Sequence, residues 1–394
     1  MRDKRRFIGL RATLAILAVT LLATGPRAVA QKQKVLYSFG SKGTDGDYPY
    51  AGVTFNAGNL YGTTLFGGAY NHGTVFELTP KAGGGWTEKI LHSFGKGGDG
   101  LEPYASVILD AAGNLYGTTY EGGSDALGTV FELTPKAGGG WIEKVLHSFN
   151  GKDGEHPYAG VILDTSGNLY GTTYQGGAAS NGTVFELTPK GGGGWTEKVL
   201  HSFGSGKDGA SPYAGVIFDG AGNLYSTTVD GGADGLGTVF ELTPKSGGKW
   251  AEKVLHSFNG NDGEHPEAGL ILDSVGDLYG ATQNTIFELI RKAGGRWTEK
   301  VLYNSGSTAS LIFGAAGKLY GTTVYGGPYN YGTVFELTRK AGGKWTETTL
   351  FDFLGGADGA YPYAGLFLGA SGNMYGTTYQ GGARSYGIVF EITP

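Results

Sequence analysis

Short apolar runs separated by turn residues fill the chain from residue 34 to its C-terminus. The segment 158–203 contains four such runs, at 158–164, 168–174, 182–188 and 195–203. The runs are rich in β-branched and aromatic residues, and Gly, Pro, Asp or Asn bound each of them. After residue 30 no stretch places apolar residues at the i, i+3, i+4 spacing of a helix. The pattern therefore predicts β-strands joined by tight turns.

These four runs form a unit that repeats along the chain. The tetrad Tyr-Gly-Thr-Thr, or a near match to it, begins at Tyr61, Tyr116, Tyr170, Tyr225, Tyr279, Tyr320 and Tyr375. The six tryptophans occupy the same position within their units, at Trp86, Trp141, Trp195, Trp250, Trp297 and Trp345. A repeat of about 54 residues with four antiparallel strands has the size of a propeller blade, whereas solenoid repeats are shorter and need no internal hairpins.

The two ends of the repeat region complement each other. The last unit stops after its third strand, at 387–393, and residues 34–39 (Lys-Val-Leu-Tyr-Ser-Phe) match the fourth strand of the other units. Pairing these two segments would complete a seventh blade and cover two exposed sheet edges. We therefore predict an all-β fold, a seven-bladed β-propeller of four-stranded antiparallel blades, with the N-terminal strand closing the ring within a single domain at 31–394.

Residues 1–30 have the pattern of a secretory signal peptide. A basic start is followed by an apolar stretch at 12–24 and by Ala28-Val29-Ala30, which predicts cleavage near Ala30 and Gln31 and a secreted or periplasmic protein. An uncleaved N-terminal anchor is the alternative. No later apolar stretch approaches the length of a membrane span, so we expect none in the mature chain, and we expect a monomer.

Charge and cysteine content narrow the possible partners. Removing residues 1–30 takes away six basic residues and one acidic residue, so the formal net charge of −5 becomes about −10. Nucleic acid is not an expected partner, because it would require a basic surface. The absence of cysteine excludes thiol nucleophiles and cysteine-ligated metals. We expect no cofactor and no metal.

The repeat motif resembles a known family. Residues 169–188 combine Leu-Tyr-Gly-Thr-Thr, a Gly-Gly pair and Gly-Thr-Val-Phe-Glu-Leu-Thr, and this combination recurs in register over nearly all of 34–394. It is similar to the Gloeo/Verruco tandem-repeat family of bacterial surface and secreted proteins. The resemblance implies a propeller-like secreted or surface protein, and it implies no established activity and no catalytic residues.

The loops that precede the first strand of each unit supply one set of candidate contacts. In a propeller these loops share a face with those between the second and third strands, and loops on a rigid scaffold often carry function. They contain Tyr50, Tyr104, Tyr158, Tyr213 and Tyr363, with Glu267 in the fifth unit. A ring of phenols at the channel mouth would suit a carbohydrate or another small polar ligand. The alternative is that these tyrosines only pack between blades.

The loops after the second strand supply further candidates. Beyond a Gly-Gly pair that serves backbone geometry, they present Tyr70, His72, Tyr329, Tyr331 and Arg384. The fifth unit lacks its Gly-Gly loop and the sixth lacks its Asp-Gly-x-x-Pro-Tyr loop, so we expect a notch on this face. The repeated Asp-Gly pairs could hold calcium, but turn chemistry is favoured over a metal site.

Repetition argues against most catalytic assignments. His92, His147, His201 and His256 occupy a fourth-strand position that elsewhere holds Tyr or Phe, so the position requires a ring, and a glutamate recurs on every third strand. Only His265, Glu267 and Asp262 form an unusual ionisable set. We expect a non-catalytic extracytoplasmic scaffold that binds a glycan or an envelope protein. The alternatives are a lyase or hydrolase with its site at the channel mouth, and a structural component of the envelope or matrix.

Overall fold

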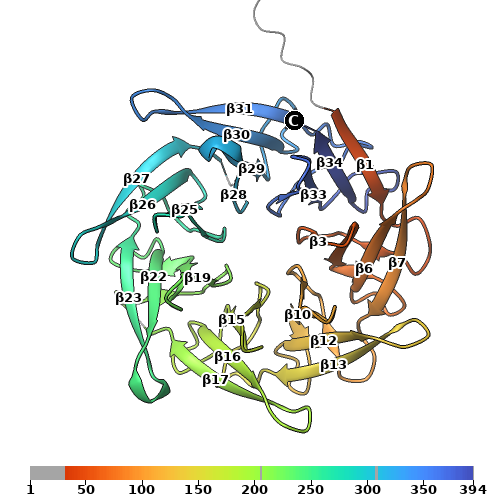
Figure 1. The fold of residues 1–394 in the computed structure, drawn as a ribbon, viewed down its shortest axis with the longest axis horizontal. Helices are drawn as coiled ribbons and strands as arrows, with labels where there is room; N and C mark the ends of the chain where they lie inside the picture. The colour runs from red at the N-terminus through yellow and green to blue at the C-terminus, as the bar shows by residue number, and fades with distance from the viewer. Residues whose placement is uncertain (1–31, 205, 307–308, 394) are drawn as a thin grey trace, which may run out of the picture. The chain divides into compact units, whose positions relative to one another are not determined.

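Seven four-stranded antiparallel sheets make up the computed structural model, which describes residues 32–204, 206–306 and 309–393. The signal peptide expected at 1–30 lies outside these residues. Figure 1 shows the sheets arranged as blades around a central axis, with the first strand of each blade innermost and the fourth outermost. The predicted seven-bladed propeller is confirmed.

The strands follow the repeat. Blades 1 to 3 contain β3 (Thr54–Asn56), β4 (Asn59–Thr64), β6 (Thr74–Pro80) and β7 (Trp86–Ser93); β9 (Ile108–Leu109), β10 (Leu115–Thr119), β12 (Thr129–Pro135) and β13 (Trp141–Ser148); and β14 (Ile162–Leu163), β15 (Leu169–Thr173), β16 (Thr183–Pro189) and β17 (Trp195–Ser202). Blades 4 and 5 contain β19 (Ile217–Phe218), β20 (Leu224–Thr228), β22 (Thr238–Pro244) and β23 (Trp250–Ser257); and β24 (Ile271–Leu272), β25 (Leu278–Ala281), β26 (Thr285–Lys292) and β27 (Arg296–Asn304). Blade 6 contains β28 (Ile312–Phe313), β29 (Leu319–Thr323), β30 (Thr333–Arg339) and β31 (Trp345–Asp352), and blade 7 contains β32 (Phe367–Leu368), β33 (Met374–Thr378), β34 (Ile388–Thr393) and β1 (Lys32–Ser38).

The N-terminal strand closes the ring as predicted. β1 pairs antiparallel with β34 from Lys32 opposite Thr393 to Ser38 opposite Ile388. The Thr377 hydroxyl on β33 then donates to the Ala51 carbonyl of blade 1 at 2.8 Å. Blades 7 and 1 are therefore joined by the same type of contact as the other neighbouring blades.

The first strand of each blade is shorter than the sequence predicts. The run at 158–164 contributes only Ile162–Leu163 to the ladder. The carbonyl of Ala159 instead accepts a hydrogen bond from the Thr118 hydroxyl of the preceding blade, at 2.9 Å. The backbone near the axis thus finds its partners between blades, because it has left the sheet.

Most of the core lies between neighbouring blades. The cluster between blades 3 and 4, for example, brings Tyr170, Val184 and Phe203 against Leu224 and Phe240. The glycine of the repeated tetrad belongs to this packing, since a Cβ at Gly171 would lie 2.5 Å from the ring of Phe185. Within the described residues, no helix has the length and apolar character needed to cross a membrane.

The loops predicted to share a face do so. Short ribbons pair the loop before the first strand with the loop after the second strand of the same blade, as in β8 (Gly100–Leu101) with β11 (Glu121–Gly122). Equivalent ribbons join β2 (Gly46–Asp47) to β5 (Phe66–Gly67), and β18 (Gly209–Ala210) to β21 (Asp230–Gly231). We call this side of the propeller the loop face, and the side formed by the other two connections of each blade the hairpin face.

Candidate functional site

The five predicted loop tyrosines converge at the axis on the loop face. Tyr50 stacks on Tyr363 with ring centroids 4.7 Å apart, and Tyr158 stacks on Tyr213 at 4.2 Å. Tyr104 lies edge-on to both Tyr50 and Tyr158. The hydroxyls of Tyr50 and Tyr213 lie 3.0 Å apart and form a hydrogen bond. We call these five residues the tyrosine collar.

The collar largely fills the mouth of the channel. A second layer of rings packs behind it, Tyr120 and Tyr174 against Tyr158, and Tyr379 against Tyr363. The remaining cavity is about 70 Å³ and is bounded by collar residues together with Glu267 and Ser310. Ligand pockets usually enclose about 300–1,000 Å³, so this space suits a few water molecules and not a sugar ring.

Burial keeps the collar phenols protonated. It raises the pKa of Tyr104 to about 12, with smaller contributions from Glu102 and the neighbouring phenols. The pKa of Tyr213 is raised above its usual value by burial first, and then by Tyr50, Tyr158 and Glu267. Glu267 is exposed, and its carboxylate accepts a hydrogen bond from the Gln283 amide at 2.9 Å. At neutral pH the collar is an uncharged set of rings beside one accessible carboxylate.

The two shortened loops lie beside Glu267. Gln283, in the short turn between β25 and β26, holds its carboxylate, and Ala309 and Ser310 of blade 6 line the same cavity. The notch expected on this face depends partly on residues 307–308, which lie outside the described residues. Within the described residues, both shortened loops border the collar at blade 5. There Glu267 takes the position that a tyrosine holds in five other blades.

The candidates in the loops after the second strand lie away from the axis. Tyr70 and Tyr329 are 44% and 62% exposed, and His72 and Arg384 are exposed as well. Tyr331 differs, because its ring packs against Tyr361 and the core between blades 6 and 7. The structure therefore separates four accessible candidates from one that serves packing.

Ring closure brings two of these candidates together. A hollow of about 580 Å³ between blades 7 and 1 is bounded by Tyr70 and Arg384, and its walls also include Lys42, Asp45, Asp47, Asn71 and Tyr386. We call it the closure pocket. Lys42 and Asp47 were not singled out from the sequence. The pairing of the chain ends was the available signal, since it places the loops of the last blade beside those of the first.

The closure pocket contains charges of both signs. Asp45 accepts hydrogen bonds from the Tyr37 hydroxyl and the Ser41 amide, each at 2.9 Å. Burial, together with the Asp45 carboxylate, raises the pKa of Asp47. Lys42 and Arg384 supply the opposing charges. Such a lining suits a polar ligand with several hydrogen-bonding groups.

The ionisable set suggested for catalysis is divided among separate partners. His265 lies with its Nδ1 3.0 Å from the Val229 carbonyl and 3.6 Å from an Asp230 oxygen. Asp262 accepts a hydrogen bond from the Asn259 side chain at 2.6 Å, while Glu267 accepts one from Gln283. The contacts described for these three residues do not form a nucleophile–base or acid–base pair with one another.

The repeated histidines have the packing role expected of a ring and also a charged partner. His147 packs edge-on against Phe149 at 4.9 Å, and its Nε2 lies 3.1 Å from Asp153. In the next blade Glu197 approaches this pair, so one ligand atom from each of the three residues falls within 4.8 Å of the others. His147, Asp153 and Glu197 could hold a metal ion, although Asp153 is also bound by the Asn150 side chain and amide. The sequence signal for this cluster is the glutamate that follows each tryptophan by two residues, as Glu197 follows Trp195. It was not used in the prediction.

The class of protein is thus defined by fold and surface, a seven-bladed β-propeller with packed tyrosines at one mouth of its axis and diversified loops on the same face. A family model described as the Gloeobacter/Verrucomicrobia repeat matches residues 27–196, 137–288 and 283–394, and the chain belongs to this family. The resemblance inferred from the repeat motif is confirmed. No curated protein sequence matches the chain.

Solved structures with the same fold have diverse functions. The chain is similar to virginiamycin B lyase from Staphylococcus aureus, with 13% identity and a TM-score of 0.56 over 92% of this chain and all of that one. It is also similar to a protein from Lactobacillus plantarum (17% identity, TM-score 0.56, 81% of this chain and 88% of that one). An ancestral GH74 enzyme matches with 14% identity and a TM-score of 0.56, over 92% of this chain and 51% of that one. At these identities the likeness shows the fold alone.

Proposed function

We propose that the protein is an extracytoplasmic binding scaffold that recognises a polar ligand, a glycan in the first instance, through the closure pocket and the loops around it. The observation that carries the proposal is the grouping of exposed aromatic and charged side chains on neighbouring blades. Tyr70 of blade 1 and Arg384 and Tyr386 of blade 7 border the closure pocket. Tyr325 and Tyr329 of blade 6 are 50% and 62% exposed.

Comparison with the other blades supports this assignment. The equivalent loops of blades 2, 3 and 4 carry Ser-Asp-Ala-Leu, Ala-Ala-Ser-Asn and Ala-Asp-Gly-Leu after their Gly-Gly pairs, and blade 5 lacks the loop. Tyrosines after the Gly-Gly pair are therefore confined to the consecutive blades 6, 7 and 1, whereas the strands beneath hardly change. Phenol faces stack on the apolar faces of sugar rings, and the opposing charges of Arg384 and Asp47 can bond to hydroxyls.

A glycan array tests the proposal directly. Labelled protein of residues 31–394 is expected to bind a subset of glycans, and the double variant Tyr70→Ala/Arg384→Ala to lose at least tenfold in affinity for them. Asp125→Ala, in the equivalent loop of blade 2, is the matched control and should bind as the unaltered protein does. Equal loss in both variants would contradict the role of the closure pocket. Binding of envelope proteins in place of any glycan would transfer the same surface to a protein ligand.

Secretion is part of the proposal and has its own test. The basic and apolar leader supports export, with cleavage between Ala30 and Gln31. N-terminal sequencing of protein recovered from outside the cytoplasm should begin at Gln31. Protein that retains Met1 and stays in the cytoplasm would contradict the location. Light scattering should give the mass of a single chain.

A further inference from the structure

The tryptophans mark a recurrent position on the hairpin face. Each of the six pairs across its hairpin with the last residue of the third strand of its blade or, in blade 5, with the residue before the last. That partner is Pro80, Pro135, Pro189 and Pro244 in blades 1 to 4, but Arg291 and Arg339 in blades 5 and 6. In blades 3 to 5, each tryptophan also faces a second-strand tyrosine of the preceding blade. The same aromatic pair thus occurs with proline beside it in blades 3 and 4 and with arginine beside it in blade 5.

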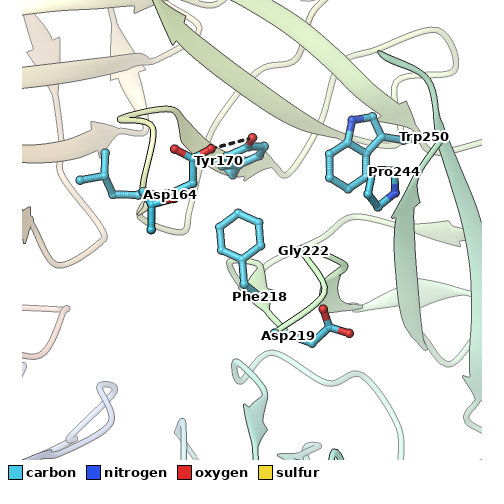
Figure 2. A pocket seen from close by; sticks show the side chains of 10 residues that line it. Asp164, Tyr170, Phe218, Asp219, Gly222, Pro244 and Trp250 are labelled. Carbon is cyan, nitrogen blue, oxygen red and sulfur yellow. Dashed lines mark hydrogen bonds between the residues drawn. The ribbon is translucent and has the colours of Figure 1, made fainter. Parts of the chain in front are cut away.

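Between blades 3 and 4 this position opens into a pocket of about 510 Å³. Three of its lining residues are Tyr170 on β15, Phe218 on β19 and Trp250 on β23, which Figure 2 shows around one hollow. Tyr170 lies at 83° to Phe218 with centroids 5.1 Å apart, and at 63° to Trp250 at 6.4 Å. Pro244 forms part of the wall next to Trp250. We call this space the seam pocket.

The polar groups of the seam pocket carry negative charge. Asp164 accepts hydrogen bonds from the Ser166 and Asn168 amides, the Asn168 side chain and the Tyr170 hydroxyl. Although burial raises it, these bonds together hold the pKa of Asp164 below its usual range. Asp219, across the pocket, is bound in the same way and its pKa is lowered too. Both carboxylates are therefore ionised, with their oxygens already occupied by donors.

No described residue lining the seam pocket is basic. Lys198 lies on the same seam, but its ammonium group lies 3.7 Å from Glu186 and donates to the Gly248 carbonyl. The pocket thus combines three ring walls with two carboxylates and no basic lining residue. A neutral sugar would need free acceptors there, whereas a cation without hydrogen-bond donors would need only charge and ring faces.

The neighbouring seam contains a cation at the corresponding place. Between blades 4 and 5, Tyr225 faces Trp297 at 6.2 Å and 65°, which reproduces the Tyr170–Trp250 pair. The guanidinium carbon of Arg291 lies 5.8 Å from the Trp297 ring centroid, within cation–π range. Arg291 occupies the position that Pro244 holds in blade 4. At this seam the chain itself therefore places an organic cation against the tryptophan. At the next seam, between blades 5 and 6, Arg339 lines a hollow of about 520 Å³ together with Tyr279, Phe313 and Trp345, so an arginine at this position does not always fill the space.

We propose that the seam pocket binds an organic cation, a quaternary or methylated ammonium group, held between Tyr170, Phe218 and Trp250. Three rings and two nearby carboxylates predict a Kd on the order of 1 mM for a small head group. The site lies on the hairpin face, so it is independent of the glycan proposal for the loop face.

Calorimetric titration with choline tests the site, and 3,3-dimethyl-1-butanol, its uncharged carbon isostere, is the control ligand. Choline should bind to the protein of residues 31–394, and the isostere should bind at least tenfold more weakly. Equal affinity for the two would show a merely apolar pocket and overturn the proposal. Absence of binding at 50 mM choline would overturn it too.

Pro244→Arg supplies the decisive variant, because it installs the residue that the same position has at 291, where the guanidinium lies over the tryptophan ring. The new guanidinium should occupy the pocket and reduce choline affinity at least tenfold, with the melting temperature unchanged or raised. Pro135→Arg, the same change in blade 2, should leave choline binding unaltered. Trp250→Leu should also abolish binding. Undiminished affinity in Pro244→Arg or in Trp250→Leu would contradict the site.

Discussion

The tyrosine collar and the seam pocket are built from the same kinds of residue, yet one is filled and the other open. At the collar, rings of neighbouring blades meet at 4.2–5.2 Å and leave about 70 Å³. At the seam pocket, Tyr170 and Trp250 stand 6.4 Å apart beside about 510 Å³. Blades of a propeller are closest at the axis and diverge outward, so rings near the axis satisfy one another while rings farther out leave space.

The space left between neighbouring rings therefore distinguishes packing residues from binding residues better than residue type does. An aromatic-rich repeat places rings at many equivalent positions, and the sequence alone left open whether the inner set binds a ligand or packs between blades. The ring contacts of the inner set join neighbouring blades and favour packing. The accessible aromatic surfaces lie farther out, at the closure pocket on the loop face and at the seam pocket on the hairpin face.

Truncation of a collar ring should have the largest effect on stability. Tyr213→Ala removes the stack on Tyr158 and the hydrogen bond to Tyr50, and we expect a loss of about 3 kcal/mol in unfolding free energy, measured by urea denaturation. Tyr213→Phe keeps the ring and should cost only about 1 kcal/mol. A loss below about 1 kcal/mol for Tyr213→Ala would show that the collar does not hold the blades together.

Alkaline titration should reveal the same contrast between buried and accessible phenols. Burial raises the pKa of the collar tyrosines, to about 12 for Tyr104, above the value of about 10 in an unfolded chain. Their contribution to stability is thus complete below pH 10 and is lost as pH rises through 12. Absorbance at 295 nm should show fewer than the 24 tyrosines ionised at pH 11 until urea is added. Full ionisation in the folded protein would contradict a closed collar.

A buried carboxyl between blades should respond to pH at lower values. Burial, and next the Asp45 carboxylate, raise the pKa of Glu88 to about 7, while Lys42 opposes them. Its neutral form therefore stabilises the fold below about pH 4.5, and this contribution disappears as pH rises through 7. Glu88→Gln should then raise the unfolding free energy at pH 8 by on the order of 1 kcal/mol and change it little at pH 4.5.

Glu347 provides the matched control for that experiment. It holds the equivalent place on β31, but its carboxylate accepts a hydrogen bond from the Thr349 hydroxyl at 3.3 Å. By contrast, Glu88 has a buried oxygen without a hydrogen-bond partner. Glu347→Gln should leave the pH dependence of stability unchanged. If both variants were equally stabilised at pH 8, the effect would come from net charge and not from the seam.

The smallest stability effect is expected at the seam pocket. Trp250 is partly buried and faces open space on one side, so Trp250→Leu should lower the unfolding free energy by about 1 kcal/mol or less. The same substitution should nevertheless abolish choline binding. A loss as great as that for Tyr213→Ala would mean that the tryptophan is a core residue and that the two regions do not differ.

The fold could be predicted from the sequence because seven imperfect copies repeat each signal. The second, third and fourth strands of blade 3 match their predicted runs to within a residue or two, and the match between 34–39 and the other fourth strands identified the closing pair. The length of the first strand could not be predicted in this way. Its residues near the axis bond to the neighbouring blade, as Ala159 does to Thr118, and such a contact is invisible in one repeat.

Part of the candidate site could also be predicted from the repeat. Convergence of Tyr50, Tyr104 and Tyr158 follows from equivalent positions around one axis, but whether the rings leave a cavity depends on the radius at which they stand. The closure pocket follows from ring closure once Tyr70 and Arg384 are brought side by side. The seam pocket was missed because only the structure shows that Pro244 and Arg291 lie at the same place, each beside a tryptophan ring.

Anomalous diffraction from crystals soaked in (2-bromoethyl)trimethylammonium would test most directly which aromatic region is open. The bromine peak should lie between Tyr170, Phe218 and Trp250, with none inside the ring of Tyr50 and Tyr213. A peak at the channel mouth with an empty seam would reverse the assignment of filled and open regions.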